Sequence, residues 1–334
     1  MIPHNKPSVS GKELFMMARS IRKKRLIGGR SVAEFEQKLA NLLETDPKHV
    51  VASNSGSSAL YIALNVIDPS RVSIPIYTCA AVSQAAQLAG AEVAFEDNEN
   101  ECSFHSKKQN EAVNTVRVLV HTFGVPHNDL EVASDVIEDC SQALGARVHD
   151  RHVGLFGQAG TFSFSATKIV STAGAGGATV FRNAEMAEYA RNIIDYDNPS
   201  ISRQRFNFQL TDVAAECGIV QLGRIKKLIS KREELFNTYN DMQIPLIAND
   251  LPKEITPVRY RAIVRVEDPD FVITRLAEHG IRSIIPIHEF EFVSDPKLFP
   301  NASSFSKKHV SLPLYPSLSF TDAKKIGKLI KSLI

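Results

Sequence analysis

The sequence predicts an α/β protein whose larger part is a doubly wound, mostly parallel sheet between helices. Short apolar runs alternate with segments of helical periodicity along most of the chain, as in such sheets. Residues 116–123 are largely β-branched or apolar, which is typical of a parallel strand covered on both faces. The length of 334 residues suffices for this domain and a smaller one. We therefore expect a large domain at 1–211, and at 212–334 a bridging helix with a small C-terminal α/β domain.

The spacing of apolar residues predicts the elements of the large domain. Helices are expected at 8–26 and 32–44, and the basic cluster at 22–25 is interpreted as a solvated helix face. Further strands are predicted at 50–52, 72–76, 92–95, 116–123, 136–139 and 178–181, and further helices at 59–66, 80–89 and 184–194.

A serine-rich turn follows the first predicted strand. Residues 53–58 read Ser-Asn-Ser-Gly-Ser-Ser and lead directly into a helix. Free backbone N–H groups and the positive end of the helix dipole make such a turn a natural cradle for a phosphate. On this turn alone, N-capping of the helix by serine is an equally good interpretation.

An acidic side chain ends the predicted strand at 136–139. Ligands of open α/β sheets bind at the carboxyl ends of the strands, so Asp139 is a candidate functional residue. The alternative is that this carboxylate only caps the following helix.

Lys168 lies where a strand gives way to a glycine-rich turn at 174–177. Before it, Phe162 and Phe164 alternate with polar residues, the pattern of a strand with one buried face. A lysine among apolar and small residues loses part of its hydration, which favours the neutral amine needed for Schiff-base chemistry. Taken alone, such a lysine more often has its ammonium group in water.

The rest of the chain predicts the bridge and the small domain. A long helix with one apolar stripe is expected at 211–242. It is followed by predicted strands at 260–266 and 281–287, a helix near 271–279 and a terminal helix at 322–333.

The composition excludes several classes of protein. Hydrophobic residues make up 43% of the chain and charged residues 23%, which is typical of a folded globular protein. The 39 basic and 37 acidic side chains leave a net charge of +2, so we expect no nucleic-acid or membrane partner. The four cysteines form no Cys-x-x-Cys pair, and the first residues lack the apolar core of a signal peptide. We expect a cytoplasmic protein.

The three loops together match the needs of pyridoxal 5′-phosphate. Its phosphate needs backbone donors, its aldehyde needs a lysine amine, and its ring nitrogen needs a carboxylate that keeps it protonated. The chain offers these groups, in this order, at Gly56-Ser57, Asp139 and Lys168.

In these stretches the chain resembles the DegT/DnrJ/EryC1/StrS sugar aminotransferases, a family of fold type I pyridoxal-phosphate enzymes. The resemblance runs from about residue 27 to 318. Its strongest motifs are SGSSAL at 55–60, HTFGVP at 121–126, IEDCSQALGA at 137–146 and FSFSATK at 162–168, with weaker similarity at 205–208 and 311–316. Each motif is a modest signal, but four in the family's order are a specific one.

The resemblance implies a role for each matching residue. Lys168 would form the Schiff base with the cofactor and then carry a proton as general acid and base. Asp139 would pair with the ring nitrogen, and Gln142 would bond the ring hydroxyl oxygen or support the ring plane. The cofactor phosphate would be held by Gly56, Ser57 and Ser163.

Further positions are implied by the family pattern. Asn207 would reach the phosphate of a neighbouring subunit, which requires a homodimer with shared active sites. Cys79 stands where the family usually stacks an aromatic residue on the cofactor, and Tyr77 could substitute for it. His288 lies where relatives approach the sugar and is a candidate substrate-binding residue. No histidine spacing indicates a metal site.

The resemblance implies an aminotransferase that moves an amino group, from glutamate, to a keto group of a nucleotide-linked sugar in polysaccharide biosynthesis. Related deoxysugar dehydratases replace the lysine by histidine, so Lys168 argues against dehydration. Two alternatives stay open: transamination of a small cyclic ketone, and a non-catalytic or regulatory pyridoxal-phosphate-binding protein.

Overall fold

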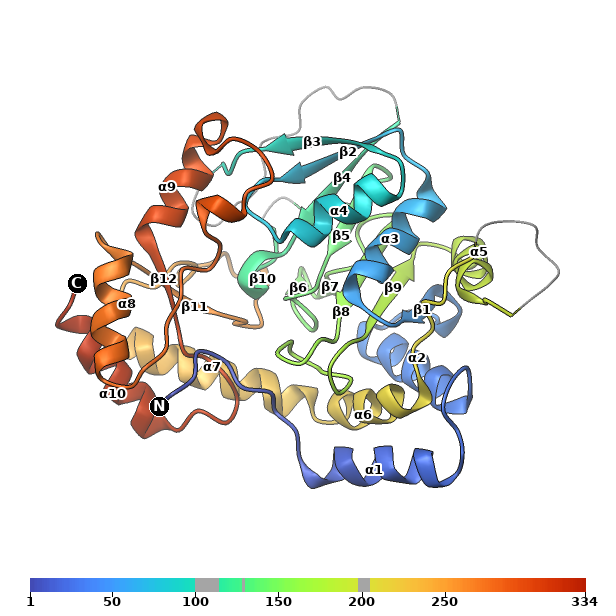
Figure 1. Ribbon diagram of the computed structural model, residues 1–334, viewed down its shortest axis with the longest axis horizontal. Helices are drawn as coiled ribbons and strands as arrows, with labels where there is room; N and C mark the ends of the chain where they lie inside the picture. The colour runs from blue at the N-terminus through green and yellow to red at the C-terminus, as the bar shows by residue number, and fades with distance from the viewer. Residues whose placement is uncertain (100–113, 128–129, 198–204) are drawn as a thin grey trace.

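A seven-stranded sheet lies at the centre of the larger part of the molecule (Figure 1), in a computed structural model that describes residues 1–99, 114–127, 130–197 and 205–334. The strand order is β1-β9-β8-β5-β4-β2-β3, with β9 antiparallel to both neighbours and the other pairs parallel. The predicted α/β class with a mostly parallel sheet is confirmed. The strands are β1 (Val50–Ser53), β2 (Arg71–Pro75), β3 (Glu92–Glu96), β4 (Thr115–Val120), β5 (Val136–Asp139), β8 (Ala159–Ser163) and β9 (Gly177–Phe181).

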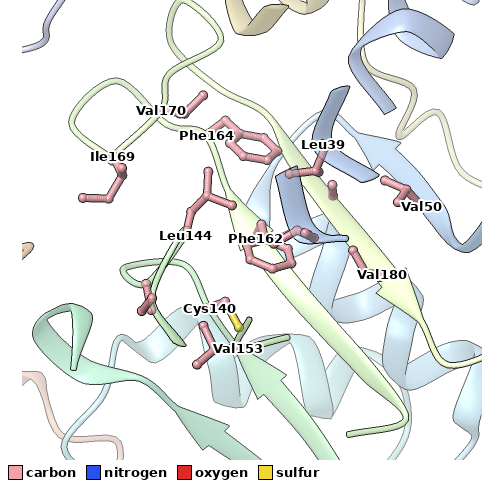
Figure 2. Packing of buried hydrophobic residues seen from close by; sticks show 14 of the residues in the cluster. Leu39, Val50, Cys140, Leu144, Val153, Phe162, Phe164, Ile169, Val170 and Val180 are labelled. Carbon is pink, nitrogen blue, oxygen red and sulfur yellow. The ribbon is translucent and has the colours of Figure 1, made fainter. Parts of the chain in front are cut away.

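Helices cover both faces of this sheet, as a doubly wound fold requires. On one face, Phe162 and Phe164 pack with Leu39 and Val180 in a buried cluster that Figure 2 shows. The side chains of successive strand residues alternate between faces, so Phe162 and Phe164 share this one. This face is covered by α2 (Arg30–Leu43) and α6 (Asp212–Leu222), and the other face by α3 (Gly56–Ile67), α4 (Ala80–Leu88) and α5 (Ala184–Ile194).

The C-terminal part of the chain has a core of its own around a two-stranded antiparallel sheet. Ala262 and Val264 point into this core, whereas Ile263 between them packs with Tyr77 and Phe123 of the larger part. The small sheet therefore turns one face toward the large one. Its strands are β11 (Ala262–Arg265) and β12 (His309–Leu312), and α7 (Ile225–Asp241), α8 (Pro269–Glu278) and α10 (Phe320–Lys331) pack in the same core. The helix α9 (Pro300–Lys308) instead packs at the contact with the larger part.

The remaining elements lie at the periphery. The helix α1 (Gly11–Arg22) packs against α6 at the lower edge of Figure 1. The first residues join the C-terminal part, because Ile2 pairs with Ile281. The domain boundary at residues 211 and 212 stays a prediction. A third, short sheet contains β6 (Arg147–Val148), β7 (Arg151–His152) and β10 (Ile255–Thr256).

Two predicted elements differ from the structure. The single helix at 211–242 is two helices, because Arg224 leaves the helical conformation (φ −119°, ψ 9°) and its guanidinium pairs with Glu13 at 2.9 Å. The strand predicted at 281–287 makes only isolated bridges, and Pro286 within it has no N–H group for a ladder. Among the described residues, no helix is both long and apolar enough to cross a membrane.

Candidate functional site

The candidate site lies at the carboxyl edge of the large sheet. The strands β1, β5 and β8 run in the same direction and end at this edge. Asp139 is the last residue of β5 and Ser163 the last of β8, while Gly56 lies three residues after the end of β1. The loop that carries Lys168 begins where β8 ends, so the predicted residues gather here from three strands.

The serine-rich turn forms the N-terminus of α3 and packs against the end of β8. The Ser55 side chain caps the helix by accepting from the Ser58 N–H at 3.0 Å. Gly56 and Ser57 follow this cap, so their N–H groups have no acceptor inside the helix. A Cβ added at Gly56 would lie 2.7 Å from the Cβ of Ser163. The Ser55 cap and two N–H groups without an acceptor in the helix thus occur together, and the close contact with Ser163 requires glycine at position 56.

Two adjacent carboxylates at the end of β5 differ in their surroundings. Asp139 is 8% exposed, and its Oδ1 accepts from the N–H of Ser141 at 2.9 Å. Glu138 is fully buried, and its two oxygens accept from three backbone N–H groups at 154–157 and from the His121 ring at 3.0 Å. Glu138 is therefore committed to holding a turn, while Asp139 keeps acceptor capacity at the sheet edge.

A buried group of possible metal ligands shares this strand end. His121, Glu138 and Cys140 place their ligand atoms within 4.8 Å of one another. The Glu138 oxygens are already occupied by four donors, and burial raises the pKa of the Cys140 thiol well above its ordinary value. The group is better explained as a hydrogen-bonded core than as a metal centre.

Gln142 is held by the turn that follows β4. Its Oε1 accepts from the N–H of Phe123 at 2.8 Å, and Phe123 has a left-handed backbone with φ of 60°. Because the amide oxygen is used, the amide nitrogen is the group left to donate to a ligand.

The Lys168 amine lies beside a residue that the sequence motifs do not include. Its Nζ is 5.3 Å from the ring centroid of Tyr260, whose N–H donates to the Phe123 carbonyl at 3.0 Å. Burial raises the pKa of the Tyr260 phenol, but the positive charges of Lys168, Arg261 and Arg232 and a hydrogen bond with Thr167 hold it below its ordinary value. The signal for Tyr260 in the sequence is the pair of arginines that flank it.

Tyr77 and Cys79 lie at the carboxyl end of β2 and differ in exposure. Tyr77 is fully buried, with its ring 5.0 Å from that of Phe305 and at a steep angle to it. Cys79 is exposed and stands directly before α4. The Tyr77 ring is therefore packed between the larger part of the molecule and the C-terminal part, and of these two residues Cys79 is the one accessible to a ligand.

Asn207 and His288 belong to other segments of the chain than the Lys168 loop. The Asn207 side chain is exposed, and its carbonyl accepts from the side chain of Asn54, next to the serine-rich turn, at 3.2 Å. The His288 ring stacks on Phe290 at 4.7 Å. Within the described part of the chain, neither side chain makes a hydrogen bond or ring contact with Lys168.

Comparison with known proteins gives a consistent picture. The sequence model of the DegT/DnrJ/EryC1/StrS aminotransferase family matches residues 8–331. A UDP-4-amino-4,6-dideoxy-N-acetyl-beta-L-altrosamine transaminase of Campylobacter jejuni is 26% identical, covering 100% of this chain and 98% of that protein. A GDP-perosamine synthase of Vibrio cholerae is 26% identical over 99% of both chains.

Further relatives extend this picture. The spore coat polysaccharide biosynthesis protein SpsC of Bacillus subtilis is 26% identical, covering 100% of this chain and 97% of that protein. The aminotransferase TlmJ of Streptoalloteichus hindustanus, a solved structure, superposes with a TM-score of 0.89 at 24% identity, covering 99% of this chain and 98% of that one. The structural likeness supports the same fold.

Proposed function

Because the chain belongs to the DegT/DnrJ/EryC1/StrS aminotransferase family, we propose that it uses pyridoxal 5′-phosphate to move an amino group from glutamate to a keto group of a nucleotide-linked sugar. The family match confirms the predicted family and the predicted aminotransferase activity. Relatives named for UDP- and GDP-linked sugars support the substrate class, and SpsC supports a setting in polysaccharide biosynthesis. The observation that carries the proposal is the gathering of cradle, carboxylate and lysine at one edge of the sheet.

The residues at this edge fit the cofactor. A Cβ at Gly56 would collide with the Ser163 side chain, so glycine lets the end of β8 approach the N-terminus of α3, where the N–H groups of Gly56 and Ser57 would be available to a phosphate. Asp139 offers an acceptor to a protonated ring nitrogen, and Gln142 offers its amide nitrogen to a ring oxygen. The bound cofactor supplies an aromatic ring that withdraws electrons from the reacting carbon.

The chain's own residues then perform the proton chemistry. The Lys168 amine would act as the general base that takes the proton from the donor's α-carbon, and its ammonium form would then donate that proton to the cofactor carbon that carries the transferred nitrogen. The Asp139 carboxylate would hold the proton on the ring nitrogen, where it is needed throughout. The buried ring of Tyr260 beside Nζ would exclude water from the amine.

The first test is the visible absorbance of the protein with added pyridoxal phosphate. We expect a band in the wild type that Lys168→Ala loses, and that glutamate alters. Lys38→Ala removes an exposed lysine of α2 and is the matched control. A wild type without this band would contradict the proposed cofactor chemistry. A band that responds to no amino donor would favour a binding protein.

We also infer that two copies of the chain assemble into a homodimer with the active sites at its interface. On α1 the polar Glu13 and Ser20 are buried, whereas Leu14 and Phe15 are 68% and 67% exposed. We interpret these exposed apolar side chains on one helix as part of an interface between copies. Asn207 at the edge of the serine-rich turn would then reach the neighbouring subunit.

A second apolar region borders the phosphate cradle itself. A groove of about 400 Å³ is lined by Ser57, Tyr61, Leu88, Phe206 and Phe208, among others, and Leu88 is 75% exposed. Because Ser57 belongs to both the cradle and the groove, a second copy seated there would complete the site.

We further propose a cytoplasmic location, since Cys79, Cys140 and Cys217 are unpaired, as in a reducing compartment.

A further inference from the structure

Arg261 lies on the side of the small sheet that faces the large one. It stands directly before β11 and two residues from Ile263, so the two side chains share a face. Ile263 packs with Tyr77 and Phe123 at the contact between the two parts. The Arg261 guanidinium is 5.4 Å from the centroid of the Tyr260 ring, the same ring that lies beside the Lys168 amine.

Within the described part of the chain, the guanidinium of Arg261 makes hydrogen bonds through one of its nitrogens. Its Nη1 donates to the His4 Nε2 at 3.2 Å and to the Ser311 Oγ at 3.5 Å. Among the described residues no carboxylate pairs with Arg261, and its Nε and Nη2 have no hydrogen-bond acceptor. A half-buried fork of unused donors is the arrangement that binds a planar carboxylate through two parallel hydrogen bonds.

His4 positions this fork without adding charge. Its ring is largely buried beside Arg261 and Arg282, and burial first, then these two charges, lower its pKa to about 3. The imidazole is therefore neutral at neutral pH, and its Nε2 serves as an acceptor for Arg261. The hydroxyl of Ser311, in β12, lies 2.8 Å from the same Nε2 and fixes the ring from the small sheet.

We propose that Arg261 binds the carboxylate of the amino donor and so turns the donor's amine toward Lys168. This inference rests on the aminotransferase function proposed above and adds a specificity-determining residue to it. One guanidinium beside a neutral imidazole matches the single charge and the planar shape of a carboxylate. The diphosphate of a nucleotide-linked sugar is the other anion that this reaction would bring, and the experiment separates the two.

The test compares Arg261→Gln with wild type in binding rather than turnover. Calorimetry on the cofactor-loaded protein measures the Kd of 2-oxoglutarate, which carries the carboxylates of the donor, and of UDP and GDP, which carry the diphosphate. We expect Arg261→Gln to raise the Kd of 2-oxoglutarate by about 10- to 100-fold. The Kd values of UDP and GDP should stay within about twofold of those of the wild type. Arg261→Lys, which keeps the charge but loses the fork, should give an intermediate value.

Arg282→Gln is the matched control, because it removes an exposed arginine that also neighbours His4. It should leave the affinity for 2-oxoglutarate within about twofold of wild type. Thermal unfolding and a retained visible band verify that each variant is folded and loaded.

Several outcomes would overturn the inference. An unchanged 2-oxoglutarate affinity in Arg261→Gln, or a wild type that binds no 2-oxoglutarate, removes it. A loss confined to UDP or GDP reassigns Arg261 to the sugar nucleotide. If the wild type binds 2-oxoglutarate through Arg261 but reacts with no amino donor, the carboxylate site stands and the proposed function fails.

Discussion

Glu138 and Asp139 are neighbours in the chain with opposite tasks. Both Glu138 oxygens are occupied by buried donors, so Glu138→Gln replaces one acceptor by an NH₂ group and leaves backbone N–H groups without partners. We expect Glu138→Gln to lower the free energy of unfolding by roughly 3 kcal/mol or more. Asp139→Asn should cost less than about 1 kcal/mol and instead weaken cofactor retention. Urea unfolding and the visible band measure the two effects, and equal stability of the two variants would contradict this division.

The buried His4 makes stability depend on pH. Its pKa is about 3 in the folded protein and ~6.5 in an unfolded chain, so below pH 6.5 the unfolded chain binds a proton that the folded one does not. Its contribution to stability is present above pH 6.5 and declines by at most about 1.4 kcal/mol per pH unit as the pH falls toward 3.

The difference in unfolding free energy between wild type and His4→Asn should therefore shrink from pH 7 to pH 5. Urea unfolding at several pH values gives this difference, and His279→Asn removes an exposed histidine as the control. A difference that is constant with pH would show that His4 titrates alike in both states.

At the scale of the element, the N-terminus of α3 depends on its first residue. Gly56→Ala would place a methyl group 2.7 Å from the Cβ of Ser163, so we expect a loss of roughly 1–3 kcal/mol in stability and a weaker hold on pyridoxal phosphate. Gly11 is the first residue of α1, and a Cβ there would meet nothing within 4 Å. Gly11→Ala is thus a matched control that should be neutral or stabilising. Thermal unfolding and cofactor titration compare the two, and similar results for both would count against the cradle.

Local patterns made several elements predictable from the sequence. The alternation of Phe162 and Phe164 predicts β8, and the ends of the parallel strands follow from short apolar runs. The break between α6 and α7 could not be predicted, because Arg224 leaves the helix to pair with Glu13, a residue 211 positions away.

In the candidate site, too, some residues are predictable from local patterns and others are placed by contacts distant in sequence. Gly56, Asp139 and Lys168 lie at the end of a strand of one sheet or shortly after it, so topology alone gathers their segments at one edge. Tyr260 and Arg261 come from another part of the chain. They are placed by the hydrogen bond from the Tyr260 N–H to the Phe123 carbonyl, which no local pattern encodes.

At the scale of the whole molecule, the proposed dimer predicts the effect of one exposed side chain. Leu88→Arg would put a charge into the apolar groove beside Ser57, so we expect it to shift the protein toward monomers and to weaken cofactor binding. Light scattering measures the molecular mass, and the visible band measures cofactor binding. Leu298→Arg changes another exposed leucine, which is 68% exposed and lies outside the groove, and serves as the control, with no change expected. A Leu88→Arg variant that keeps the wild-type mass would argue against this interface.

The contact between His4 and Ser311 spans 307 positions of the chain. During synthesis on the ribosome, the N-terminal residues emerge first and must wait until β12 has been made before this contact can form. Arg261 stays without its His4 and Ser311 scaffold for the same interval. In the nascent protein, the Arg261 guanidinium is therefore positioned to bind a carboxylate only late in folding, after the large sheet is complete. Incomplete products of translation would lack this positioned guanidinium.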